Sequence, residues 1–190
     1  MSTIILLVVL AGVALWVVGA YNGLVSLKNQ VVNAWKQIDV QLKRRHDLIP
    51  NLVNTVKGAM NFERSTLDAV ISARNRAVSA TGVQQTAQAE GELTQALGRL
   101  FALTEAYPDL KATGNVAQLQ EELTSTENKI GFARQLYNDV ATQYNTKQMQ
   151  FPTNLVSGLA KASPAELWEI EDAAERAVPA VDLSLNKPAT

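Results

Sequence analysis

The chain has 190 residues, a formal net charge of −1 and no cysteine. The near-neutral charge gives no indication of nucleic-acid binding, and the lack of cysteine excludes disulfides, thiolate metal sites and a cysteine nucleophile. The charge is unevenly distributed, with nine Lys/Arg against four Asp/Glu from Lys28 to Arg76, and six Asp/Glu against two Lys/Arg from Ser163 to Thr190. This asymmetry indicates either complementary contacts, within one molecule or between neighbours, or two solvated faces.

The first predicted element is an uncharged apolar helix from Ile4 to Ala20. About 20 helical residues cross a hydrocarbon core of about 30 Å, so residues 1–22 are expected to anchor the chain in a lipid bilayer. A cleaved signal peptide is the alternative, with Val18-Gly19-Ala20 as the cleavage site, although no Lys or Arg precedes the apolar run. Because the basic residues follow the anchor, we expect the N-terminus outside and the rest of the chain in the cytoplasm.

A helical stripe of apolar residues continues beyond the anchor, mostly at spacings of three and four. It comprises Leu24, Val31, Trp35, Ile38, Leu42, Ile49, Val53 and Val56. No Gly or Pro separates Leu24 from Ile49, so the anchor and the first soluble helix are predicted to form one rod. Pro50 predicts either a kink near Asp47 or a fresh helix that Asp47 caps.

Further amphipathic helices are predicted at about residues 51–80, 84–106 and 116–151. Gly82 suits the left-handed position that follows a helix end. No segment alternates with a period of two over the length of a strand. The fold class is therefore all-α: an N-terminal transmembrane helix continuing into an antiparallel four-helix-type bundle over residues 23–161.

An acidic, proline-containing tail is predicted for residues 162–190, after a short helical turn between Thr153 and Lys161. The tail is expected to include one short helix at about residues 165–176.

One long run identifies a family resemblance. Asn33-Ala34-Trp35 is followed by IDVQLKRRHDLIPNLV from Ile38 to Val53, and Tyr107-Pro108-Asp109-Leu110-Lys111, Tyr144-Asn145 and Phe151-Pro152 fit as well. Over nearly its whole length the chain resembles the LemA family. The resemblance implies a single-pass protein of the bacterial inner membrane with an antiparallel helical bundle, and it supplies no biochemical reaction.

No pattern in the sequence predicts catalysis, a cofactor or a metal site. His46 is the only histidine, and neither a His-Glu-x-x-His motif, a glycine-rich phosphate loop nor a Gly-x-Ser-x-Gly elbow occurs. The basic run from Lys43 to Arg45 lies about 30 Å beyond the anchor, several Debye lengths from lipid headgroups. Arg44 and Arg45 are therefore expected to bind acidic side chains of the bundle, such as Glu121, Glu122 or Glu127, or the acidic tail of a neighbour.

We expect one candidate interaction region on the first rod. Its residues are Trp35, Asp39, Lys43, Arg44, Arg45, His46, Asp47, Pro50 and Asn51. The predicted function is a membrane-anchored scaffold or adaptor that forms a homo-oligomer, with coiled-coil-like packing and without catalysis. The alternative is a membrane-tethered module that binds a protein or signalling partner; nucleic acid is not an expected partner.

Overall fold

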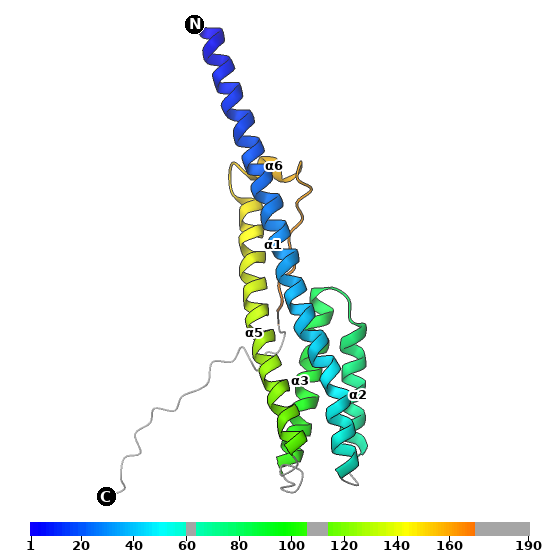
Figure 1. The fold of residues 1–190 in the computed structure, drawn as a ribbon. Helices are drawn as coiled ribbons and strands as arrows, with labels where there is room; N and C mark the ends of the chain where they lie inside the picture. The colour runs from blue at the N-terminus through cyan, green and yellow to red at the C-terminus, as the bar shows by residue number, and fades with distance from the viewer. Residues whose placement is uncertain (60–63, 106–113, 170–190) are drawn as a thin grey trace, which may run out of the picture.

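The computed structural model describes residues 1–59, 64–105 and 114–169 (Figure 1). Its longest element is α1, Ser2–Ala59, a single α-helix of 58 residues. Among the described residues, only α1 is long and apolar enough to cross a membrane, and its most apolar window is 0% buried. The predicted rod, in which the apolar N-terminal stretch continues into the bundle, is therefore confirmed.

The other helices pack against the part of this rod that follows the apolar span, and the long ones run in alternating directions. They are α2, Arg64–Ser79; α3, Val83–Glu105; α5, Gly114–Met149; and the short α6, Asn154–Ser157. Figure 1 shows α5 running antiparallel to α1 along most of the bundle, while the α2–α3 hairpin covers only the end far from the N-terminus. The all-α antiparallel bundle agrees with the predicted fold class.

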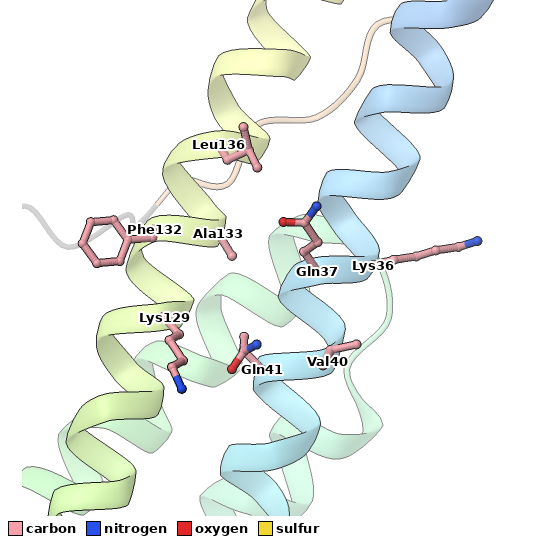
Figure 2. A pocket seen from close by; sticks show the side chains of 8 residues that line it. All are labelled: Lys36, Gln37, Val40, Gln41, Lys129, Phe132, Ala133 and Leu136. Carbon is pink, nitrogen blue, oxygen red and sulfur yellow. The ribbon is translucent and has the colours of Figure 1, made fainter.

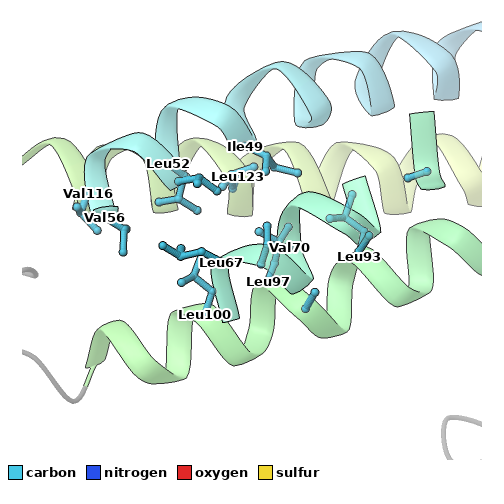
Figure 3. Packing of buried hydrophobic residues seen from close by; sticks show 14 residues of the cluster. Ile49, Leu52, Val56, Leu67, Val70, Leu93, Leu97, Leu100, Val116 and Leu123 are labelled. Atoms are coloured by element: carbon cyan, nitrogen blue, oxygen red, sulfur yellow. The ribbon is translucent and has the colours of Figure 1, made fainter. Parts of the chain in front are cut away.

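The apolar stripes of these helices meet in two clusters. The far core joins all four long helices and is built around fully buried aliphatic side chains (Figure 3). These include Ile49, Leu52, Val56, Val70, Leu93 and Leu100. The near core, closer to the apolar span, joins α1 and α5 through Leu24, Ile38, Ile130, Tyr137 and Tyr144, and it includes Trp168 from beyond α6.

Two helix boundaries differ from the sequence-based expectation. Residues 51–59 belong to α1 rather than to the second helix, because Pro50 neither ends α1 nor lets Asp47 cap a new helix. The expected helix at 165–176 is wrong over its described part, since residues 162–169 have no helical hydrogen bonding; residues 170–176 lie outside the described residues. The expected stop after α2 is confirmed, with Gly82 at φ 81° in the left-handed region.

Candidate functional site

Pro50 lies inside α1 and cannot donate a backbone hydrogen bond to the carbonyl of His46, one turn earlier. Arg74 of α2 supplies the missing donor, with its Nε 2.8 Å from the His46 carbonyl oxygen. Because this carbonyl is paired from a neighbouring helix, α1 continues through the proline. The Pro50 ring is exposed, so it takes no space in the core.

The side chain of His46 also belongs to a buried ion network that joins α1, α3 and α5. The network consists of Arg45, His46, Glu90, Thr94 and Glu127. The Arg45 Nη1 atom lies 3.2 Å from Glu90 Oε2 and 3.0 Å from Glu127 Oε2. Its Nη2 atom donates to Thr94 Oγ1 at 2.8 Å. His46 Nε2 donates to the other oxygen of Glu90 at 2.6 Å. Each oxygen of the buried carboxylate therefore has its own donor.

Burial makes the completeness of this network decisive for stability. The side chains of Arg45 and Glu90 are each only 4% exposed, so both charges have lost most of their hydration. Full mutual pairing offsets that loss, whereas removal of one partner from a buried pair costs about 3–5 kcal/mol. The network thus fixes the register of α1 against α3 and α5.

The same geometry leaves the network little capacity for ligand chemistry. A guanidinium already occupies the place between the carboxylates that a cation would take. Across residues 1–59, 64–105 and 114–169, no group of three or more His, Asp or Glu side chains could hold a metal ion. A cavity of about 210 Å³ lies beside Arg45, lined also by Leu97, Phe101 and Leu123. It is smaller than the usual small-molecule site of about 300–1,000 Å³.

The other predicted interaction residues of α1 do not join this network. Lys43 and Asp47 form an exposed pair at 2.8 Å, and the hydrogen bond from Lys43 lowers the pKa of Asp47. Arg44 is exposed and makes no side-chain hydrogen bond or ion pair within the described part of the chain. Partial desolvation raises the pKa of Asp39. Asn51 is exposed, and its carbonyl accepts the Thr55 hydroxyl at 2.8 Å.

A second polar arrangement holds the C-terminal strap, residues 163–169, against α5. The Asn145 side chain brackets the Ala165 backbone, accepting its N–H and donating to its C=O, both at 2.8 Å. Asn138 brackets Trp168 in the same way, at 2.8 Å from its N–H and 3.0 Å from its C=O. The Tyr137 hydroxyl donates to the Glu166 carbonyl at 2.7 Å. Side chains of α5 therefore replace helical hydrogen bonds along the strap.

The strap ends in an aromatic anchor. Trp168 is 4% exposed and lies 5.9 Å, centroid to centroid, from Trp35 of α1, which meets the Tyr137 ring edge-on at 5.5 Å. The Arg134 guanidinium lies 5.5 Å from the Trp168 ring centroid, a cation–π distance. Burial, and then the charge of Glu166, raise the pKa of Tyr137 above its ordinary value. Trp35, predicted as an interaction residue, thus contacts the chain's own C-terminal segment.

The sequence-based candidates did not include the strap contacts of α5, although a signal was present. Within α5 the pair Tyr-Asn occurs twice, at Tyr137-Asn138 and Tyr144-Asn145, seven residues apart and hence on one helix face. Both tyrosines are buried, which aims the following asparagines at the edge of the core. Two asparagines repeated at this spacing on one helix face can bind the backbone of an extended segment that runs along the helix.

On the other side of the α1–α5 pair, away from α3 and the strap, lies an open groove (Figure 2). Gln37, Gln41 and Ala133 line its floor, and Val40, Phe132 and Leu136 give it an apolar rim. Those three rim side chains are 63%, 72% and 43% exposed. Lys36 and Lys129 add positive charge to the rim. We call these eight residues the open groove.

Comparisons with known proteins give a family and several relatives. The model of the LemA family matches residues 34–183. Protein LemA of Metamycoplasma hominis is 32% identical over 142 residues, covering 74% of this chain and 64% of that protein. Magnetosome protein MamQ 2 of Paramagnetospirillum magneticum is 23% identical over 181 residues, covering 82% of this chain and 66% of that protein. The chain thus spans slightly less than two thirds of the length of these relatives.

Proposed function

Because the chain belongs to the LemA family, we propose that it is a membrane-anchored helical scaffold or adaptor that self-associates laterally in the bacterial membrane and catalyses no reaction. A non-catalytic role is supported by the buried ion network, in which Arg45 and His46 both bind the carboxylate of Glu90. The basic residues that follow the apolar span support a cytoplasmic bundle with the N-terminus outside.

The open groove is the observation that supports self-association, with a second copy of the chain as its occupant. Single exposed apolar residues are ordinary, but Val40, Phe132 and Leu136 line one groove together. Since α1 runs unbroken from the apolar span to the bundle, lipid would hold every copy upright with this groove at the same height. Copies that meet in the membrane plane therefore present matching surfaces, as an isologous contact requires.

The positive charge on the rim of the groove makes the salt dependence of binding differ between a second copy of the chain and an acidic partner. An isologous contact brings two copies of Lys36 and two of Lys129 to one interface, so screening by salt should strengthen it. An acidic partner bound at the same lysines would instead dissociate as the salt concentration rises.

A membrane-tethered module for a protein partner is the second candidate, favoured by the asparagine brackets of α5. Asn138 and Asn145 recognise the backbone of an extended segment, which is a general way to bind a peptide. If the purified chain stayed single in lipid while crosslinks in cells joined it to other proteins, this second function would replace self-association.

Counting copies in a bilayer tests self-association directly. Full-length protein carrying one fluorophore per chain is reconstituted at low density, and bleaching steps are counted for each particle. The wild-type protein is expected to give several steps, with more at high salt. Phe132→Glu places a charge in the contact and should lower the count, whereas the matched control Val78→Glu, at an exposed position of α2, should not. Single steps for the wild type at all densities would overturn the proposal.

A further inference from the structure

We propose that the C-terminal strap exchanges between neighbouring copies, so that residues 163–169 of one chain bind the asparagine brackets of the next. This inference rests on the proposed lateral self-association and adds a second contact, on the opposite side of the α1–α5 pair from the open groove. The occupant is the identical segment of a second copy.

The brackets fit an extended backbone by spacing alone. Asn138 and Asn145 are separated by about 10 Å along the helix, at about 1.5 Å per residue. Ala165 and Trp168 are separated by about 10 Å in an extended chain, at about 3.3 Å per residue. Each asparagine therefore meets a backbone N–H and C=O without reading the side chain between them. A neighbour's strap offers the same groups in the same register.

Besides those brackets, the strap has one large buried side chain. Trp168 packs between Trp35 and Arg134, and the Tyr137 hydroxyl binds a strap carbonyl. All of these groups come from α1 and α5, and every copy carries them. The binding site is therefore complete in each molecule, whichever chain supplies the strap.

The turn that leads into the strap contains a strained backbone conformation, which favours opening of the turn. Lys161 has φ 45°, a left-handed conformation that a side chain with a Cβ adopts only at a cost. Its N–H bonds to the Gly158 carbonyl at 3.2 Å, and the Ala162 N–H bonds to the Ser157 carbonyl at 3.0 Å, which together turn the chain back along the bundle. In an exchanged strap this hinge is released to extended backbone, and strained hinges of this kind favour swapping.

The reach of the hinge restricts exchange to touching neighbours. Val156 of α6 is buried and fixes the start of the hinge. The six residues from there to position 162 span at most about 20 Å when extended, roughly the width of two packed helices. Two isologous contacts on opposite sides of one rod, the open groove and the exchanged strap, would build an open row of copies in the membrane plane.

Because the chain contains no cysteine, introduced thiols report strap exchange cleanly. Thr142 lies on α5 between the two brackets, and Glu166 lies in the strap between the two bracketed residues. Full-length Thr142→Cys with one tag and full-length Glu166→Cys with another are co-reconstituted in phosphatidylethanolamine–phosphatidylglycerol vesicles and mildly oxidised. Exchange predicts disulfide-linked dimers that carry both tags. Ala117→Cys, exposed on α5 but remote from the strap, replaces Thr142→Cys as the collision control and should give few such dimers.

Hinge variants then test the mechanism. Lys161→Gly removes the strain of the closed turn and should lower the mixed-tag yield about fivefold. Lys161→Pro cannot adopt the closed turn or donate to Gly158, so it should raise the yield. A chain carrying both thiols reports whether the strap remains docked on its own α5 and confirms that the variants fold.

The outcomes separate this inference from the proposed function. If only intrachain disulfides form while bleaching still counts several copies per particle, strap exchange is wrong and self-association stands. If the particles are single copies and no mixed-tag dimer forms, both are wrong. Mixed-tag dimers at the level of the Ala117→Cys control, or a yield that does not respond to either change at Lys161, would also overturn exchange.

Discussion

If Arg74 replaces the hydrogen bond that Pro50 removes, the two residues must be energetically coupled. The structure places Arg74 Nε 2.8 Å from the His46 carbonyl, the group that an N–H at position 50 would otherwise reach. We therefore consider the variants Pro50→Ala, Arg74→Ala and their combination. Pro50→Ala restores the helical donor, so it should make the arginine partly dispensable.

The expected magnitudes follow from the state of that one carbonyl. Arg74→Ala in the native background leaves it partly buried and unpaired, which costs about 1–3 kcal/mol. Pro50→Ala relieves the ring clash and improves helix propensity, which stabilises by up to about 3 kcal/mol in a helix interior. With Ala at position 50, Arg74→Ala should cost about 1 kcal/mol less, because the carbonyl keeps its helical partner.

Urea unfolding of the full-length protein in detergent micelles measures this cycle. Fluorescence of Trp35 and Trp168 reports loss of the near core, while Trp16 in the apolar span gives a constant background. Arg76→Ala is the matched control, since it removes an arginine of α2 that pairs with exposed Glu92 and should cost the same in both backgrounds. An equal cost for Arg74→Ala with Pro and with Ala at position 50 would refute the replacement.

Three further outcomes are expected. Glu90→Gln should destabilise by about 3–5 kcal/mol; a cost below about 1 kcal/mol in urea unfolding would mean that the pair is hydrated. The pKa of Asp47 is lowered on folding, so the stability that its carboxylate contributes is present above the unfolded-state pKa and is lost as pH falls through the folded-state pKa. The pKa of Asp39 is raised on folding, so ionisation of Asp39 destabilises the protein as pH rises from the unfolded-state pKa through the folded-state pKa. Asp47→Asn and Asp39→Asn should therefore change the pH profile of unfolding in opposite senses, and matching changes would contradict this. Trp168→Phe should keep the strap docked, whereas Trp168→Ala should speed hydrogen exchange of the bracketed amides; equal exchange in both variants would show that the ring does not hold the strap.

The sequence predicted the helices well because their apolar spacing is a local property. It was wrong to start a second helix near residue 51, because α1 continues through Pro50 to Ala59. The sequence shows the hydrogen bond that proline removes, but the donor that replaces it, Arg74, comes from another helix. Of the three acids expected as partners of the basic run, Glu121, Glu122 and Glu127, the structure pairs Glu127 with Arg45. Glu90 was missed, although an acid three residues before Leu93 on an apolar stripe indicates a buried partner.

The strap was mispredicted for a similar reason. A helix from residue 165 satisfies local propensity, but the hydrogen bonds that decide the conformation come from Asn138 and Asn145 on α5. Only tertiary structure brings those amides to residues 165 and 168. The sequence shows that Asn138 and Asn145 repeat beside Tyr137 and Tyr144, but it does not show which segment these asparagines bind.

Because α1 is helical without a break from the apolar span to the far end of the bundle, a change of its tilt in the membrane moves that far end sideways. From residue 22 to Ala59 the helix extends about 57 Å past the apolar stretch, at about 1.5 Å per residue. Transmembrane helices adjust their tilt when bilayer thickness changes, and a change of about 10° would swing the far tip sideways by about 10 Å. Lipid composition would thereby alter how closely the distal ends of adjacent molecules approach.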